Sequence, residues 1–290
     1  TWPTKILFTK RNGRSLRRPW DACRDGKVEE VRNLLQNPQL NVNWQNYFGQ
    51  TPFLIACRCG YIEIVELLLN DERIGVDINK ANEYLRTPFW IACFEGHIKV
   101  MKLLLNDKRT DINKATLEDW TPLYLACFEG CSEVVKLLLN DQRVDVNQAN
   151  NDGKTPFWIA CGNEYIEIVK LLLNDERVDV NKGNFEGTPL HCICQNNQFE
   201  IVQFILGMRR DVNLNAKDNN GKLPIDIARE REQMGIYGWE RSRESEEKCR
   251  ERKMNCAKII ELLESFERNP IKIRTKLRIQ LGFAGNSFFF

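Results

Sequence analysis

The stretch that decides the fold reads TPFLIACRCGYIEIVELLLN at residues 51–70, and VDIN follows at residues 76–79. Thr51 can cap a helix with its hydroxyl, and Pro52 suits the first helical position, where its missing N–H is not needed. Gly60 ends this short helix because glycine adopts the left-handed conformation readily. The second helix is apolar on more than one face, which indicates burial between neighbours. The stretch therefore predicts two short helices followed by an extended turn.

The same pattern returns along most of the chain. One position of the first helix recurs every 33 to 36 residues, as Ala22, Ala56, Ala92, Ala126, Ala160, Ile193 and Ala228. Cysteine follows this position in six copies, at Cys23, Cys57, Cys93, Cys127, Cys161 and Cys194. A period of this length predicts stacked units, each of which buries its apolar face only against its neighbours.

Taken together, the Thr-Pro start, the Ala-Cys pair, the inter-helix glycine, the leucine row and the Val-Asp-x-Asn turn resemble the ankyrin repeat over roughly residues 20–265. The tetratricopeptide repeat has a similar length, but it lacks the Thr-Pro start and the extended turn. The resemblance implies an all-α fold, a solenoid of about seven stacked helix–turn–helix units with extended turns between them. It also implies a protein–protein interaction module or scaffold that binds a partner protein through its concave face.

The ends of the chain differ from the middle. We expect a basic N-terminal arm at 1–19, repeats one to six and the start of repeat seven at 20–230, a charged insertion at 231–252, the last outer helix at 253–267 and a basic amphipathic tail at 268–290. The Arg- and Glu-rich insertion is expected to be extended or disordered. The tail alternates apolar and basic residues as a strand does, while Ile273, Leu277 and Leu281 also fit one stripe of a helix. Folding back onto the last repeat is favoured over pairing with a partner or contact with an anionic membrane.

Charge and cysteine usage restrict the function. Residues 1–20 hold six basic residues and residues 268–290 hold five, with no acid in either, so the body between them sets 31 basic residues against all 40 acidic ones. An acidic body disfavours a nucleic-acid groove. The 11 cysteines form no Cys-x-x-Cys motif, and most of them recur too far apart to pair, which favours a reducing interior and hence the cytoplasm. The basic run at 10–18 also allows nuclear import.

No motif of a catalytic or cofactor site occurs in the sequence. A phosphate-binding glycine loop, a Gly-x-Ser-x-Gly elbow and a His-Glu-x-x-His pair are all missing, and the only histidines are His97 and His191. We therefore expect no enzyme activity, no cofactor and no metal. Two alternatives stay open: a substrate-recognition or regulatory region of a larger enzyme or ligase complex, and direct binding of nucleic acid or anionic lipid through the basic ends.

One departure from the family pattern concerns the histidine that ties neighbouring turns together in Thr-Pro-Leu-His. Only His191 keeps it, while Trp90, Tyr124 and Trp158 replace it in other repeats. Packing is expected to replace hydrogen bonding at those positions.

The resemblance also implies where a partner binds, because turn tips and the residues before the inter-helix glycine line the concave face of ankyrin repeats. Aromatic residues and arginine favour interfaces. The positions assigned to protein binding are Tyr47, Phe48, Arg58, Glu83, Tyr84, Arg86, Phe94, Glu95, Glu118, Trp120, Phe128, Glu129, Lys154 and Phe185. Phe94 and Phe128 fit packing between repeats equally well, whereas Tyr84 and Trp120 favour binding.

Overall fold

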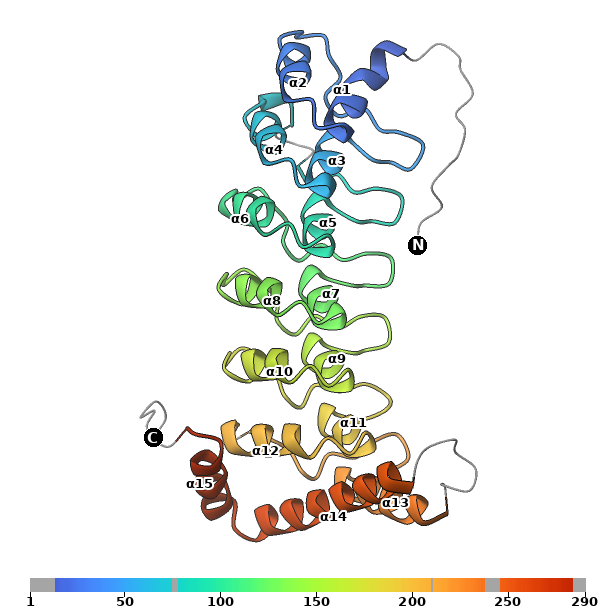
Figure 1. Cartoon of the computed structure of the whole chain (residues 1–290), viewed down its shortest axis with the longest axis vertical. Helices are drawn as coiled ribbons and strands as arrows, with labels where there is room; N and C mark the ends of the chain where they lie inside the picture. The colour runs from blue at the N-terminus through green and yellow to red at the C-terminus, as the bar shows by residue number, and fades with distance from the viewer. Residues whose placement is uncertain (1–13, 75–77, 210, 238–245, 284–290) are drawn as a thin grey trace. The chain divides into compact units, whose positions relative to one another are not determined.

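The computed structural model describes residues 14–74, 78–209, 211–237 and 246–283. The chain divides into two compact units, residues 1–117 and residues 118–290. Unit 1 holds repeats one to three and unit 2 holds repeats four to seven. Within each unit the first helices of the repeats lie side by side in one layer and the second helices in another (Figure 1). We call these the inner and the outer helices.

Unit 1 consists of three helix pairs. Its inner helices are α1 (Arg14–Arg24), α3 (Pro52–Cys59) and α5 (Pro88–Phe94), and its outer helices are α2 (Val28–Leu35), α4 (Ile62–Leu69) and α6 (Ile98–Asn106). A short 3-10 helix, η1 (Glu72–Ile74), follows α4. Helix α1 begins at Arg14, so the first repeat starts inside the segment that was assigned to the basic arm. Pro19 therefore lies within the helix instead of at its start.

Unit 2 consists of four helix pairs and one further helix. Its inner helices are α7 (Pro122–Glu129), α9 (Pro156–Gly162), α11 (Pro189–Gln195) and α13 (Pro224–Tyr237), and its outer helices are α8 (Ser132–Leu139), α10 (Ile166–Leu173), α12 (Phe199–Met208) and α14 (Glu246–Arg268). Helix α15 (Pro270–Gln280) follows α14. The described residues form no β-strand. They contain a single isolated β-bridge, between Asn184 and Gly187 in one turn.

The inner helices begin as their sequences require. The hydroxyl of Thr51 accepts a hydrogen bond from the N–H of Leu54 at 3.1 Å, and Pro52 occupies the first turn. Thr121 caps α7 in the same way, through the N–H of Tyr124. The alanine and cysteine columns are buried, as are the middle leucines of the outer helices. Burial raises the pKa of these thiols, to about 12 for Cys23, so they act as small apolar side chains.

An arginine after each of several outer helices reaches back to the preceding repeat. In unit 1 the guanidinium of Arg73 donates to the carbonyl oxygen of Leu35 at 3.0 Å and pairs with Asp71. In unit 2 Arg177 donates to the carbonyl oxygen of Leu139 at 2.9 Å. The last carbonyls of a helix have no partner within it, so each arginine supplies a cap from the next repeat. We call the residues that bond a preceding repeat in this way the arginine caps: Arg73, Arg109, Arg177, Arg209 and Arg274.

The extended turns are tied by asparagine. The side-chain amide of Asn147 donates to the carbonyl oxygen of Arg177 at 2.7 Å, and its oxygen accepts the N–H of Asp179 at 2.8 Å. Asn79 makes the same pair of bonds with Arg109 and Asp111 in unit 1. One asparagine side chain therefore bonds one carbonyl oxygen and one N–H group in the turn of the next repeat.

The charged insertion is largely helical, which corrects the expectation of an extended or disordered segment. Helix α13 continues to Tyr237 and α14 begins at Glu246, so much of 231–252 belongs to the last helix pair, while 238–245 lie outside the described residues. The two helices pack against each other along their length (Figure 1). Arg229 pairs with Glu264 at 2.9 Å across them. This pair lies just outside the insertion, at either end of the helix pair that the insertion extends.

The tail forms helix α15, so the strand interpretation was wrong and the helical stripe was right. Leu277 is buried, and α15 packs against α12 and α14, which confirms folding back onto the last repeats. Arg274 donates to the carbonyl oxygens of Leu206 and Arg209 at 3.3 Å each. The basic tail therefore contributes the last of the arginine caps.

Candidate functional site

The turn tips of repeats two, three, five and seven are each built around one Asn or Asp side chain. In repeat three the side-chain oxygen of Asn82 accepts the N–H groups of Tyr84 and Arg86 at 3.0 Å each. Leu85, between them, has a φ of 56°, where the equivalent tip of repeat two has Gly49. A left-handed conformation costs a side-chain-bearing residue about 1–2 kcal/mol. The tip of repeat three therefore holds Tyr84 and Arg86 in place through a strained turn.

In unit 1 four of the residues assigned to binding lie in or beside an aromatic column. The guanidinium of Arg86 lies 5.3 Å from the ring centre of Tyr84 and 5.0 Å from that of Trp90. Trp90 in turn stacks on Phe94, with ring centres 5.6 Å apart. Tyr84, Leu85 and Phe94 are each 40% exposed. The column runs from the turn tip to the end of α5, and Glu83 is exposed beside it.

The other assigned residues of unit 1 form two smaller groups. Tyr47 is 86% exposed at the tip of repeat two and touches Phe48 edge-on. Arg58 at the end of α3 pairs with Glu95 just after α5 at 3.6 Å. Tyr47 has the most exposed aromatic ring among the described residues.

In unit 2 Trp120 is half-buried and packs within its own repeat. Its ring centre lies 5.3 Å from that of Tyr124 and 4.7 Å from that of Phe128. Glu118 and Glu129 are exposed at the tip and at the end of α7. Trp120 and Phe128 thus pack on each other while part of each side chain is exposed. This geometry fits packing and binding equally.

At the position of the histidine in Thr-Pro-Leu-His, two repeats form a hydrogen bond to the next turn, where packing alone was expected for Tyr124. The hydroxyl of Tyr124 accepts a bond from the amide of Asn150 in the next turn at 3.2 Å, and burial raises its pKa to about 12. His191 bonds Thr188 in its own repeat and the carbonyl oxygen of Lys222 in the next turn. The expectation that packing replaces the hydrogen bond was therefore wrong for Tyr124, because its longer side chain still reaches the next turn.

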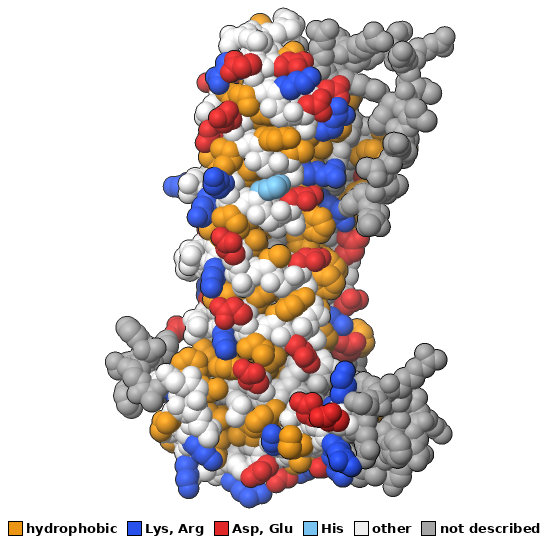
Figure 2. Space-filling model, viewed as in Figure 1, with side chains coloured by type: hydrophobic (Ala, Val, Ile, Leu, Met, Phe, Trp, Pro, Cys, Tyr) orange, Lys and Arg blue, Asp and Glu red, His pale blue; other side chains and the backbone are white. Residues whose placement is uncertain are grey.

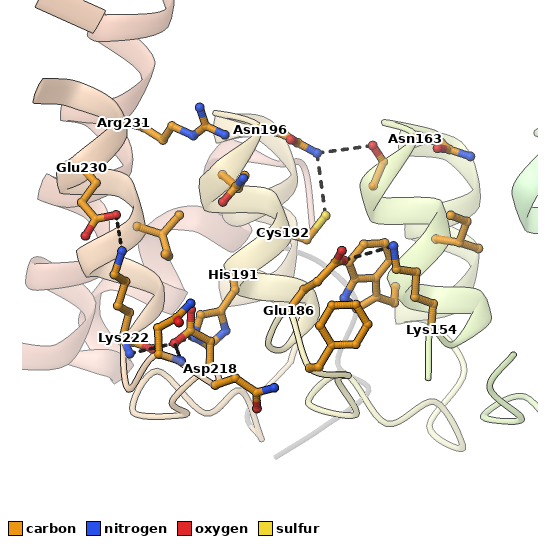
Figure 3. Close-up of a pocket in the computed structure, with 18 of the residues that line it drawn as sticks. Lys154, Asn163, Glu186, His191, Cys192, Asn196, Asp218, Lys222, Glu230 and Arg231 are labelled. Carbon is orange, nitrogen blue, oxygen red and sulfur yellow. Dashed lines mark hydrogen bonds and ion pairs between the residues drawn. The ribbon is translucent and has the colours of Figure 1, made fainter. Parts of the chain in front are cut away.

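A groove of about 810 Å³ lies in unit 2 along the ends of α9 and α11 and beside α13 (Figure 3). Its rims carry Phe185 and Met234, which are 59% and 58% exposed. Lys154 crosses it, with its ammonium 4.2 Å from the ring centre of Trp158 and 3.0 Å from the carboxylate of Glu186. The groove thus brings together two of the assigned residues, Lys154 and Phe185.

Sequence reasoning missed the contribution of repeat seven to this groove. Glu230, Arg231 and Met234 of α13 line it, with Lys222 from the turn before α13. The run from Ala228 to Met234 holds no helix-breaking residue, and this signal would have predicted a longer inner helix. Asn163, Gln195 and Asn196 also line the groove, at positions that the family pattern places on the concave face.

Three further observations concern metal binding, membrane spanning and thiol reactivity. They contain no group of three or more His, Cys, Asp or Glu side chains that could hold a metal ion. None of the helices in the described ranges is long and apolar enough to cross a membrane. Desolvation, followed by the nearby carboxylate of Glu186, raises the pKa of Cys192 in the groove to about 12, so its thiol is protonated at neutral pH.

Comparison with known proteins agrees with the fold. A family model described as ankyrin repeats in three copies matches residues 20–116, 74–150, 109–184 and 142–218. The crystal structure of the ankyrin repeat domain of Bcl-3, described as a unique member of the IkappaB protein family, is similar with a TM-score of 0.66 and 21% identity, over 72% of this chain and 92% of that one. The likeness at this identity supports the fold, an ankyrin-repeat solenoid. The matched residues span more than half of the sequence, and the chain belongs to the ankyrin-repeat family, whose repeats are in general non-catalytic protein-interaction modules.

Proposed function

We propose that this chain binds a partner protein through the turn tips and the ends of the inner helices of its two units. One observation carries the proposal: most of the large apolar side chains that are exposed among the described residues lie there, namely Tyr47, Tyr84, Leu85, Phe94, Leu117, Phe185 and Met234. Clustered exposed apolar residues on a soluble protein mark interaction sites. Aromatic anchors surrounded by polar groups are typical of interface centres.

Local contacts support the proposal, because they hold these side chains in fixed positions. Tyr84 lies against the guanidinium of Arg86, and Phe94 lies flat on Trp90. A side chain that is fixed before binding loses little conformational entropy when the partner arrives. The exposed rings are therefore suited to act as anchors.

The remaining parts of the proposal are a partner that is another protein, a cytoplasmic setting and no catalytic role for this chain. Ten of the 11 cysteines are free thiols, most of them buried, and they fit a reducing compartment. Acidic and basic side chains are interspersed on the visible face of each unit, which does not favour a phosphate backbone as the ligand (Figure 2).

The proposal is tested by affinity capture with the intact chain, followed by identification of the captured protein and titration with it. Tyr84→Ala, at a turn tip, should reduce its capture at least about tenfold, as expected of an interface anchor. Lys136→Ala is the matched control, because Lys136 is exposed on outer helix α8. A partner that is retained equally by Tyr84→Ala, Trp120→Ala and Phe185→Ala binds elsewhere, and the proposal fails.

A further inference from the structure

The groove of unit 2 exists because one side chain is missing. Position 162 ends α9, where the equivalent residue of α7 is Phe128 and that of unit 1's α5 is Phe94. Gly162 has no left-handed backbone, and a Cβ added to it would meet the Trp158 ring at 3.3 Å and the Cys192 sulfur at 3.6 Å. The contact with the sulfur is an ordinary one and the contact with the Trp158 ring is tight, so a small shift of the ring would admit a Cβ, and the backbone conformation does not require glycine here. Its effect is to leave open the space that a phenylalanine ring fills in other repeats.

The far side of the groove is a wall formed by the last inner helix. Helix α13 has 14 residues, whereas α9 and α11 have seven each. The additional residues extend it by about 10 Å at 1.5 Å per residue. They carry Arg231 and Met234 beside the groove (Figure 3).

Most charges that line the groove are already used within the protein. Lys222 pairs with Glu230 at 2.7 Å, as Lys154 does with Glu186. The carboxylate of Asp218 accepts two backbone N–H groups of its turn, at 2.8 and 2.9 Å. These groups hold the rim together and leave little charge for a ligand.

One charged group that lines the groove is not used in this way. Arg231 makes no ion pair with any described residue. Its guanidinium is a positively charged hydrogen-bond donor that matches the geometry of a carboxylate. The complementary ligand therefore brings an acidic group to this side of the groove.

We propose that this groove binds an extended segment of the partner protein that presents an acidic side chain to Arg231 and a bulky apolar side chain to the space above Gly162. The apolar side chain lies between Phe185 and Met234. The amide nitrogens of Asn163 and Asn196 already bond the carbonyl oxygens of Phe128 and Gly162, so these side chains offer their oxygens as acceptors to the peptide backbone of the segment. Gln195, which also lines the groove, offers both a donor and an acceptor. The inference rests on the proposed function and gives the chemistry of the partner at one part of the surface.

The test uses the intact chain and fluorescein-labelled Gly/Ser peptides that carry one Glu and one Phe at varied spacing. Matched sets carry Gln or Lys in place of Glu, and binding is read by fluorescence anisotropy. We expect at least one Glu peptide to bind about tenfold more tightly than its Gln counterpart, and Arg231→Gln to remove that difference. Gly162→Phe should weaken the same peptide at least about tenfold, while Gly162→Ala leaves its affinity within about threefold.

Arg229→Gln is the matched charge control, because Arg229 lies on the same helix but pairs with Asp226 and Glu264 away from the groove. Unchanged thermal melts show that Gly162→Phe and Arg231→Gln still fold. The inference is overturned if no Glu peptide binds, if Lys peptides bind better, or if Arg231→Gln behaves as Arg229→Gln does. Loss of the captured partner in Tyr84→Ala but not in Gly162→Phe or Arg231→Gln overturns this inference and leaves the proposed function intact.

Discussion

Two edges of the same repeats differ in how far their residues recur from one repeat to the next. After the outer helices the chain repeats one Asp-x-Arg arrangement, as in Asp107 with Arg109 in unit 1 and Asp175 with Arg177 in unit 2. At the ends of the inner helices the residues change from one repeat to the next, from Phe128 to Gly162 to Gln195 within unit 2. Side chains that recur hold neighbouring repeats together. Side chains that vary from repeat to repeat are available to determine what binds. The missing ring at Gly162, together with the longer α13, leaves a groove in unit 2.

The largest effect expected on the structural side comes from the core between the outer helices. Leu138 is fully buried in α8, so Leu138→Ala should lower the free energy of unfolding by about 2–5 kcal/mol. Its neighbour Leu137 is only partly buried and serves as control, with a smaller loss expected. Urea unfolding followed by circular dichroism measures both. A loss below about half a kcal/mol for Leu138→Ala is inconsistent with its burial.

The next effect tests the variable edge at Trp120. Trp120→Ala should weaken binding of the captured partner by about 2 kcal/mol if the ring is an anchor. Because the ring also packs on Tyr124 and Phe128, the variant should lose about 1 kcal/mol of stability as well. A partner titration and a thermal melt on the same variant separate the two. Lower stability with unchanged affinity makes Trp120 a packing residue and moves the binding surface elsewhere.

A smaller effect is expected at the recurring edge. Arg177→Met removes the guanidinium that bonds the carbonyl oxygens of Leu139, Asp141 and Val144, and should destabilise unit 2 by about 1–2 kcal/mol. Lys136→Met is the control, since its ion pair with Glu167 is exposed and worth little. Partner affinity should stay unchanged in both variants. If Arg177→Met melts as the wild type does, the arginine caps do not couple the repeats.

The smallest effect is a gain in stability. Leu85→Gly relieves a left-handed leucine at the tip of repeat three, and should raise the free energy of unfolding by about 0.5–1 kcal/mol. Glu83→Gly, at the same tip but without a positive φ, should give no gain. The two melts are compared directly. No gain in Leu85→Gly indicates that contacts of the leucine side chain offset the strain of the turn.

The fold could be predicted because the repeat is dictated by local chemistry. The Thr-Pro caps, the small Ala-Cys pair and the leucine row act within one repeat and its neighbour, so a single sequence displays them many times. The arginine caps were missed, although Asn-Asp-x-Arg recurs after the leucine row, for example at residues 70–73 and 174–177. Their targets are backbone carbonyls of the preceding repeat, 38 residues away for Arg73 and Leu35, and a backbone group has no sequence signature.

The candidate site could be predicted only in part, for a related reason. Tip residues such as Tyr84 and Phe185 are recognisable because their side chains are unusual for a turn. No single residue type marks a groove in a sequence. This one results from the missing side chain of Gly162 and from the additional turns of α13. The charged composition of 231–252 pointed to an extended or disordered segment, whereas α13 continues to Tyr237 and α14 begins at Glu246.

The arginine caps form in the order in which the chain is synthesised. Every cap comes from the repeat that is synthesised later, so the end of one outer helix is complete only when the following loop has left the ribosome. For Leu35 and Arg73 the interval is 38 residues, which at about 5–20 residues per second corresponds to about 2–8 seconds. During translation the newest helix end is therefore always uncapped, and in the finished protein Arg274 of the tail is the last to supply such a bond.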